Sequence, residues 1–257
     1  MLILIAESKT MTACDRMVDP QSYKDHRPID YDTALGIMAH IAKMSPQEIA
    51  GHSGLSGSMS LKLHRMSLEF PNENVGQQAI DAYTGVVFKA LDYSTLSEAD
   101  RSQMCRNVRI ISSLYGWLRP DDIIKAYRMD YTSRLSPNDK AMYAFWRDRV
   151  SANLAAECQS SGCNEILNLL PGDAEKCVDW KLVKRYANVW KVDFKQLKDG
   201  GTFATPHAGQ LKTLRGHLLR EIAKQHIETP TDLLALSTEL LLPMGASDRP
   251  DHITFCV

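Results

Sequence analysis

Two arginines and an aspartate follow an apolar segment near the middle of the chain. Residues 109–114 (RIISSL) have the composition of a buried strand, and Arg119, Arg128 and Asp130 come soon after it. Polar residues just past a buried strand often form sites in α/β proteins. The guanidinium is permanently charged, and its planar fork matches phosphate or carboxylate. This segment therefore predicts a site for an anionic partner. The alternative is structural arginines that tie loops to backbone carbonyls.

Lys9 follows a second predicted strand, residues 2–5 (LILI). A lysine at a strand end is a frequent anion-binding or reactive group, and a solvated surface lysine is the alternative. Asp130 is close enough in sequence to form an ion pair with Arg128. Such a pair would orient the guanidinium towards a ligand, and the alternative is that it only stabilises the loop. If Lys9, Arg119, Arg128 and Asp130 share one cleft, they would suit an enzyme that neutralises developing negative charge.

Residues 45–68 predict two short helices joined by a turn. Ser45 and Glu48 form a helix-start pattern, because a capping serine and a glutamate three residues later satisfy each other's backbone donors. The first helix ends in the glycine-containing segment 51–57, and the second runs over residues 58–68. The pattern is typical of a helix-hairpin-helix element, and it is also an ordinary packing unit.

The turn between these helices holds Gly54 and Gly57. A hairpin of this kind presents backbone N–H groups to a DNA phosphate, and such binding does not read the base sequence. Lys62, His64 and Arg65 on the second helix would add positive charge. The element therefore predicts contact with the phosphate backbone of double-stranded DNA.

The charge of the chain is balanced overall but uneven along its length. There are 30 basic and 31 acidic residues, so the total says nothing about nucleic acid. Residues 176–224 hold eleven lysines and arginines against four acids, a net charge of +7. This window predicts a basic face, with a set of solvated surface lysines as the alternative.

The sequence lacks the motifs that mark several classes of protein. The six cysteines show no C-x-x-C or zinc spacing, no histidine pair has H-x-x-x-H spacing, and no phosphate- or dinucleotide-binding glycine motif appears. We therefore expect no metal and no cofactor, with the cysteines reduced and several of them buried. The N-terminus has no signal-peptide pattern, and no apolar run suits a membrane span. These features favour a cytoplasmic protein that does not contact a membrane.

Strand and helix patterns alternate along the whole chain, which predicts one α/β domain, residues 1–257, with a mixed sheet. We expect strands at residues 2–5, 86–88, 109–114, 166–170, 189–194, 202–205 and 253–257. We expect helices at residues 32–44, 46–51, 58–68, 72–83, 139–158, 209–225 and 231–236, and one that begins near residue 97.

Several motifs occur in a characteristic order: MLILI with Lys9-Thr10, YTGVV at 83–87, ISSLYGWLRP at 111–120, YRMD at 127–130, YAFW at 143–146 and Asn168-Leu169. This order resembles the YaaA family of peroxide-stress proteins. The resemblance covers essentially the whole chain. It implies a mixed sheet wrapped in helices around a positively charged cleft, with a helix-hairpin-helix-like element. It also implies a DNA-binding protein that limits hydrogen peroxide damage, in part by lowering free intracellular iron.

The resemblance assigns the cleft to seven positions and also marks departures. The positions are Lys9, Arg119, Arg128, Asp130, Lys176, Lys212 and Arg215. Ala6-Glu7-Ser8 stands where the family usually has Ser-Pro-Ala, Asp130 where a Glu is usual, and Thr213 where a second Lys is common. Residues 170–174 (LPGDA) replace a stretch that normally holds Ser and Glu-Tyr. The cleft is therefore expected to be retained in part, with one fewer positive charge.

Two functions from different classes remain open on the sequence. The first is a non-enzymatic DNA-binding protein of the peroxide-stress response, whose binding would be independent of sequence and sensitive to salt. The second is an enzyme that acts on a phosphorylated or nucleotide substrate in the same basic cleft. A small phosphate-bearing ligand would discriminate them, because a ligand that binds only the native state raises its stability.

Overall fold

The computed structural model describes residues 1–257 except 73, 247–248 and 250. In the first half of the chain the elements are β1 (Leu2–Ala6), α1 (Pro20–Asp25), α2 (Tyr31–Ile41), α3 (Pro46–Ser53), α4 (Gly57–Glu69), β2 (Gln77–Gln78), α5 (Ala79–Ala82), α6 (Val86–Leu91), η1 (Tyr93–Thr95), α7 (Glu98–Asn107), β3 (Val108–Ser112), β4 (Gly116–Leu118) and β5 (Ile123–Ile124). In the second half they are α8 (Met142–Ser161), β6 (Glu165–Asn168), α9 (Gly172–Glu175), α10 (Trp180–Val183), β7 (Asn188–Leu197), β8 (Phe203–Ala204), α11 (Ala208–Lys224), η2 (Pro230–Ala235), β9 (Leu242–Ala246) and β10 (His252–Cys256).

The main sheet is mixed and has the strand order β4-β3-β1-β6-β7-β10-β9, with β8 paired to β7. Strands β3, β1, β6, β7 and β10 are parallel, whereas β4, β8 and β9 pair antiparallel with their neighbours. The chain first adds β3 on one side of β1 and later adds β6 on the other. The carboxyl ends of β1 and β6 therefore form a topological switch point, where open α/β sheets bind ligands.

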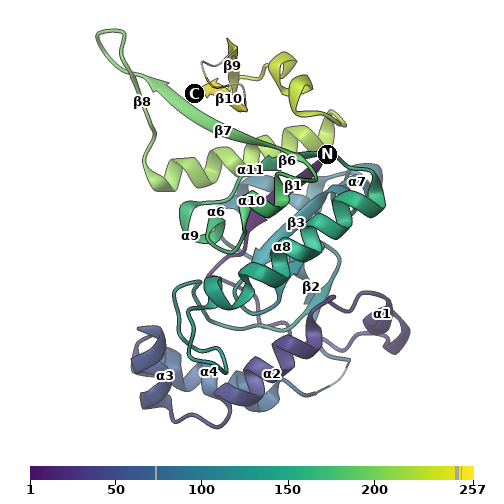
Figure 1. Ribbon diagram of the computed structural model, residues 1–257, viewed down its shortest axis with the longest axis vertical. Helices are drawn as coiled ribbons and strands as arrows, with labels where there is room; N and C mark the ends of the chain where they lie inside the picture. The colour runs from purple at the N-terminus through teal and green to yellow at the C-terminus, as the bar shows by residue number, and fades with distance from the viewer. Residues whose placement is uncertain (73, 247–248, 250) are drawn as a thin grey trace.

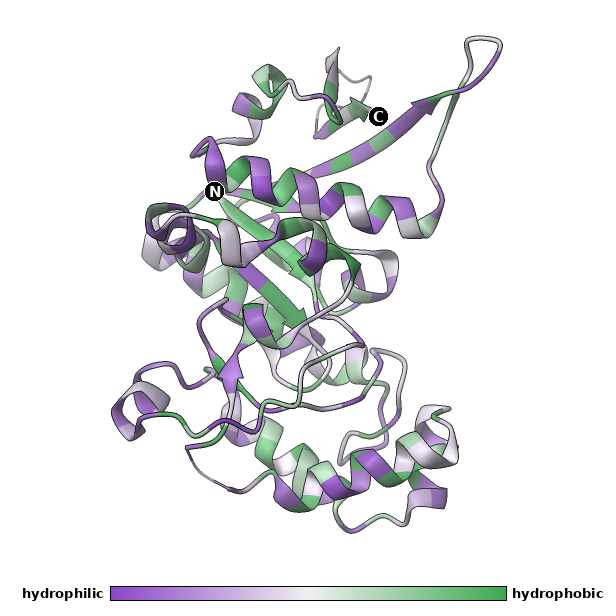
Figure 2. Cartoon of the chain, turned by 180° about the vertical axis from the view of Figure 1, so that it is seen from behind, coloured by the Kyte–Doolittle hydropathy of each residue, from purple (hydrophilic) through white to green (hydrophobic). Residues whose placement is uncertain are grey.

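Helices cover both faces of this sheet, so the predicted mixed α/β fold is confirmed. Helix α8 lies across the face seen in Figure 1, and α11 lies across the opposite face seen in Figure 2. The apolar strands lie between these layers (Figure 2). Helices α2, α3 and α4 form a separate group below the sheet in Figure 1, on the side toward which β1 runs.

Local sequence signals account for most of the elements. Ser45 and Glu48 form the predicted capping box at the start of α3, and Ser97 forms one with Asp100 at the start of α7. Helix α8 buries an apolar stripe of Met142, Trp146, Val150 and Leu154, with Phe145 half-buried beside it. The two helices of the 45–68 unit are present, joined through Gly54 in the left-handed conformation at φ +69°.

The helix predicted over residues 72–83 is largely wrong. Among the described residues of this range, only Ala79–Ala82 are helical, and Gln77–Gln78 form β2, which pairs antiparallel with β5; residue 73 lies outside the described part. A Cβ at Gly76 would lie 2.7 Å from the Ile123 side chain and 2.8 Å from the Ile124 backbone oxygen. This close approach of two backbones is a tertiary contact that overrides local helix propensity.

The strand predicted over residues 86–88 is also wrong, because Val86–Leu91 form helix α6. A short apolar run does not distinguish a strand from a buried helix by periodicity alone. Helix α6 packs closely against α11: a Cβ at Gly216 would lie 2.3 Å from the Val87 backbone oxygen. The crossing of these two helices, which the local sequence does not reveal, fixes this segment as a helix.

Candidate functional site

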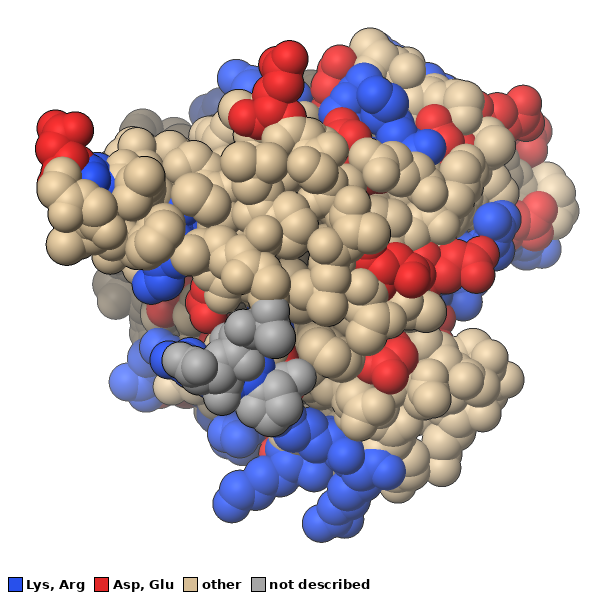
Figure 3. All heavy atoms as spheres, turned by 90° about the horizontal axis from the view of Figure 1, so that it is seen from above, with Lys and Arg blue, Asp and Glu red and all other residues tan. Residues whose placement is uncertain are grey.

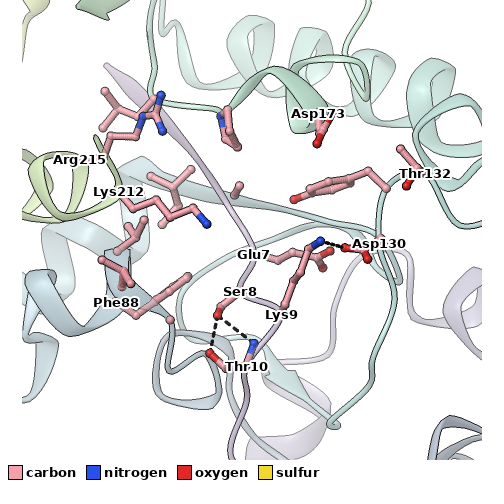
Figure 4. A pocket seen from close by; sticks show the side chains of 18 residues that line it. Glu7, Ser8, Lys9, Thr10, Phe88, Asp130, Thr132, Asp173, Lys212 and Arg215 are labelled. Carbon is pink, nitrogen blue, oxygen red and sulfur yellow. Dashed lines mark hydrogen bonds and ion pairs between the residues drawn. The ribbon is translucent and has the colours of Figure 1, made fainter. Parts of the chain in front are cut away.

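The first cavity lies at the topological switch point and is called here the switch-point pocket. Its volume is about 450 Å³, and residues that follow β1 and β6 line it together with α6, α11 and the loop after β5. Its principal side chains are Glu7, Lys9, Phe88, Asp130, Tyr131, Asp173, Lys212 and Arg215. Figure 4 shows Glu7 near the centre, with Lys212 and Arg215 on one side and Asp173 and Thr132 on the other.

Glu7 is the first polar residue after β1, and its carboxylate is held by hydrogen bonds. The Ser113 backbone N–H donates to Oε2 at 2.9 Å, and the Tyr127 hydroxyl donates to the same oxygen. Burial raises the pKa of the Glu7 carboxyl to about 7, although these hydrogen bonds oppose the rise. Glu7 can therefore take up or release a proton near neutral pH, as a general acid or base must.

Behind Glu7 lies a chain of hydroxyl groups. The Tyr127 hydroxyl lies 2.6 Å from that of Tyr83 and 2.7 Å from that of Ser112. Burial raises the pKa of both tyrosines well above the ordinary value, so they stay protonated and act as hydrogen-bond donors. The network fixes the orientation of the Glu7 side chain.

Lys9 forms an ion pair with Asp130 across the mouth of the pocket. Within the described part of the chain, Asp130 therefore pairs with Lys9 in place of the predicted partner Arg128. The Lys9 side chain is 62% exposed and that of Asp130 is 23% exposed. Such an exposed pair contributes little stability, so the lysine can exchange its carboxylate for another anion.

Lys212 and Arg215 project into the pocket from one face of α11, three residues apart. Burial lowers the pKa of the Arg215 guanidinium, and the nearby Glu175 carboxylate opposes this. The side chain nonetheless stays charged at neutral pH, because arginine starts from so high a pKa. Two cations at this spacing can hold one anionic group on the wall opposite Asp173.

A second cavity of about 790 Å³ adjoins the first and is called here the cationic cleft. It lies between α4, the segment that follows Lys9, and the loop after β5. Its charged lining consists of the cations Lys9, Lys62, Arg65, Lys125 and Arg128 and the acids Asp15 and Glu69. Cations therefore outnumber acids, as a surface that binds phosphate requires.

One cation of this cleft is held in place, and another has a buried donor without a partner in the described part of the chain. The Lys125 ammonium donates to the Phe70 and Asn72 backbone oxygens, and it lies 5.3 Å from the Phe70 ring centroid. The Arg128 Nη1 atom is buried and has no hydrogen-bond partner among the described residues. An unsatisfied buried guanidinium N–H is costly unless a ligand supplies an acceptor.

The predicted site residues are brought together in part. Lys9, Asp130, Lys212 and Arg215 line the switch-point pocket, whereas Lys9, Lys62 and Arg128 line the cationic cleft. Lys9 belongs to both cavities. Thus Lys9, Arg128 and Lys212 lie along two adjoining cavities, and the predicted single cleft is divided.

Four predicted residues line neither cavity. Arg119 is exposed at the turn after β4, where its backbone N–H donates to Asp122. Lys176 lies 3.5 Å from Asp173 and 5.7 Å from the Tyr143 ring centroid. Gly54 caps the end of α3 and Gly57 is the first residue of α4, whose later residues form a wall of the cleft.

The basic window at residues 176–224 is partly neutralised by acids from outside it. Lys176, Lys184, Lys191 and Arg220 pair with Asp173, Asp251, Glu175 and Asp92. On the face in Figure 3, Lys and Arg gather along one edge, and both signs appear elsewhere. The linear charge count therefore overstates the basic face.

Sequence reasoning missed Glu7 as a functional residue. It named Glu7 only as a departure from the family pattern, although a carboxylate directly after a buried strand was an available signal. It also missed Gly85, where a Cβ would lie 2.2 Å from the Ser8 hydroxyl oxygen, so the two loops that line the pocket touch there. That contact joins segments far apart in the sequence.

Thiols and metal ligands add little to this site. All six cysteines are free, and Cys14, Cys158 and Cys177 are buried. Burial raises the pKa of the Cys158 thiol to about 11, so this thiol stays protonated at neutral pH and is a poor redox sensor. Across the described residues, no group of three or more His, Cys, Asp or Glu side chains is placed to hold a metal ion. None of the described helices is both long and apolar enough to span a bilayer.

The fold and its site define an α/β protein in which a cationic cleft adjoins a switch-point pocket. The family described as peroxide stress protein YaaA matches residues 1–241. A UPF0246 protein of Parabacteroides distasonis is 33% identical over 241 residues, which are 93% of this chain and 92% of the relative. A UPF0246 protein of Laribacter hongkongensis is 30% identical over 243 residues, again 93% and 92%. The chain therefore belongs to the peroxide stress protein YaaA family, which confirms the resemblance and supports a role in peroxide stress.

Proposed function

We propose that this protein binds double-stranded DNA through the cationic cleft, without sequence preference, and thereby helps to limit oxidative damage during peroxide stress. The observation that carries the proposal is the set of four cations, Lys9, Lys62, Arg65 and Arg128, that are at least partly exposed in a cavity beside α4 whose described lining holds only two acids. Contacts to phosphate supply affinity that does not depend on base sequence.

The cleft offers two kinds of contact to a DNA backbone. Lys62 and Arg65 are exposed on α4, so they can follow a phosphate strand along the surface. Arg128 is partly buried, and its free N–H needs an acceptor such as a phosphate oxygen. The turn at Gly54 and Gly57 would add backbone N–H donors if it acts as a helix-hairpin-helix.

The part of the proposal that concerns iron rests on the family resemblance. We propose that the protein limits iron-dependent damage, in a cytoplasmic setting, by occupying DNA and in part by lowering free intracellular iron. The expected readout is fewer strand breaks in DNA exposed to Fe²⁺ and peroxide when the protein is bound.

Charge reversal within the cleft tests the DNA-binding proposal. Fluorescence anisotropy with duplexes of unrelated sequence should give similar affinities for the native protein. The double variant Lys62→Glu/Arg65→Glu should weaken binding by at least ~100-fold, because it removes two phosphate contacts and adds two repulsive charges. The matched control is Lys181→Glu/Arg185→Glu, which makes the same charge change at exposed positions outside both cavities. Equal loss in both variants would refute the cleft as the binding surface.

The second candidate function is an enzyme that acts on a phosphorylated or nucleotide substrate in the switch-point pocket. It is favoured by Glu7, with its pKa of about 7, opposite the cations Lys212 and Arg215. A thermal-shift panel of nucleotides and sugar phosphates tests it. Stabilisation by one compound and by no other would favour the enzyme, and a blank panel together with duplex binding would favour the first candidate.

A further inference from the structure

The two cavities adjoin at Lys9 and Thr10, which line both of them. At this junction the Ser8 hydroxyl accepts from the Thr10 backbone N–H at 3.1 Å and lies 3.0 Å from the Thr10 hydroxyl. The Lys9–Asp130 ion pair stands at the same place. A chain of phosphates in the cleft would therefore pass directly beside the mouth of the switch-point pocket.

We propose that the switch-point pocket receives a single nucleotide swung out of DNA held in the cationic cleft. The inference rests on the proposed function, because the cleft must hold the DNA first. Proteins that read or modify one base extrude its nucleotide into a pocket of this kind and recognise the exposed edge of the base.

The size and walls of the pocket suit a nucleoside with its phosphate. The volume of 450 Å³ lies within the range of roughly 300–1,000 Å³ that small-molecule sites occupy. Phe88 and Tyr131 supply aromatic walls, and the Tyr131 ring is fixed by a hydrogen bond from its hydroxyl to the Ile111 backbone oxygen at 2.8 Å. Base rings gain stability by packing on such surfaces, whatever the base.

The polar groups of the pocket can hydrogen-bond to the edge of the base and bind the phosphate of such a nucleotide. Within the described part of the chain, the Ser113 backbone N–H and the Tyr127 hydroxyl both donate to Oε2 of Glu7, which leaves Oε1 for a ligand. When ionised, it accepts from an amino or ring N–H group, and when protonated it donates to a ring nitrogen or carbonyl. Lys212 and Arg215 would hold the phosphate on the side of α11.

The Lys9–Asp130 ion pair breaks when the nucleotide enters the pocket. Lys9 is exposed and belongs to both cavities, so it can move from Asp130 to a phosphate at the junction. This assigns Lys9 as a positioning residue for the extruded nucleotide.

A duplex that contains one 2-aminopurine tests the proposal, because stacking quenches this base and extrusion restores its fluorescence. Anisotropy on the same duplex measures binding separately. For the native protein we expect a several-fold rise in fluorescence that saturates together with the anisotropy. The variant Thr132→Trp fills the pocket from an exposed position on its lining. It should bind DNA within about two-fold of the native affinity, as expected for a residue outside the phosphate contacts, and should lose the fluorescence rise.

Thr202→Trp is the matched control, because Thr202 is exposed on the β7–β8 turn, away from both cavities. It should retain both signals. Saturated binding without a fluorescence rise, or a full rise in Thr132→Trp, would overturn the inference while leaving DNA binding intact. No binding by anisotropy would overturn both proposals. Stabilisation by a free deoxynucleoside monophosphate, lost in Thr132→Trp and without a rise on DNA, would assign the pocket to free nucleotides instead.

Discussion

Replacing Glu7 by glutamine should change how the stability of the protein depends on pH. The folded-state pKa of about 7 lies above the ordinary value of 4.5, so the folded state binds the proton more tightly than the unfolded state. For an acid raised in this way, stability is greatest below the unfolded pKa and falls as pH rises through the window from 4.5 to 7. Glutamine has no such titration, and its side-chain oxygen can still accept from Ser113 and Tyr127.

The magnitude follows from the two pKa values. Between pH 5 and pH 8, the linkage relation gives a loss of about 2.5 kcal/mol in the free energy of unfolding of the native protein relative to Glu7→Gln. Asp122 contributes a similar trend, because burial also raises the pKa of its carboxyl to about 7. That contribution is common to both proteins and cancels in the difference.

Urea unfolding at pH 5, 6, 7 and 8, followed by tryptophan fluorescence, measures this difference. The free energy of unfolding of Glu7→Gln minus that of the native protein should increase by about 2.5 kcal/mol between pH 5 and pH 8. Glu98→Gln, at an exposed position in the first turn of α7, is the control and should show a constant difference. If the free energies of unfolding of Glu7→Gln and the native protein change with pH in parallel, Glu7 does not titrate near neutrality. That result would refute a role for Glu7 as a general acid or base.

Further substitutions and one chemical probe test the packing, a helix cap and the thiol chemistry of the fold. Gly216→Ala should cost roughly 1–3 kcal/mol in urea unfolding, because its Cβ would meet a backbone oxygen of α6. Gly36→Ala, with open space around its Cβ in α2, should instead gain about 0.5–1 kcal/mol, and equal effects would contradict this account. Ser45→Ala should cost about 1 kcal/mol by removing the capping box, and a neutral result would show that the cap is dispensable. Cys158 should react with a thiol reagent more slowly than Cys163 at pH 7.5, with mass spectrometry as the readout.

The elements that the sequence predicted well are those with local causes. The capping box at Ser45 and the apolar stripe around Trp146 depend on residues three or four positions apart. A short stretch of sequence therefore contains the interactions that determine them. The strand at residues 2–5 is apolar throughout because β1 is buried at the centre of the sheet.

The elements and ion pairs that the sequence did not predict depend on contacts between residues far apart in the chain. Residues 86–88 belong to a helix that packs closely against α11, and this approach depends on Gly216, far along the chain. Asp130 meets Lys9 rather than a neighbour in sequence, and the partners of four basic residues in the window 176–224 lie outside that window. Spacing along the chain shows which residue types are available for a site, whereas only the folded arrangement shows which of them meet.

The salt dependence of DNA binding tests the central claim most directly. Four cations of the cleft (Lys9, Lys62, Arg65 and Arg128) are at least partly exposed. If each neutralises one phosphate, the slope of log K against log salt concentration should be about −3.6 for the native protein. Lys62→Gln/Arg65→Gln should reduce it to about −1.8, because two contacts are lost, while Lys181→Gln/Arg185→Gln should leave it unchanged. A slope near zero for the native protein, or the same slope in all three proteins, would contradict DNA binding through the cationic cleft.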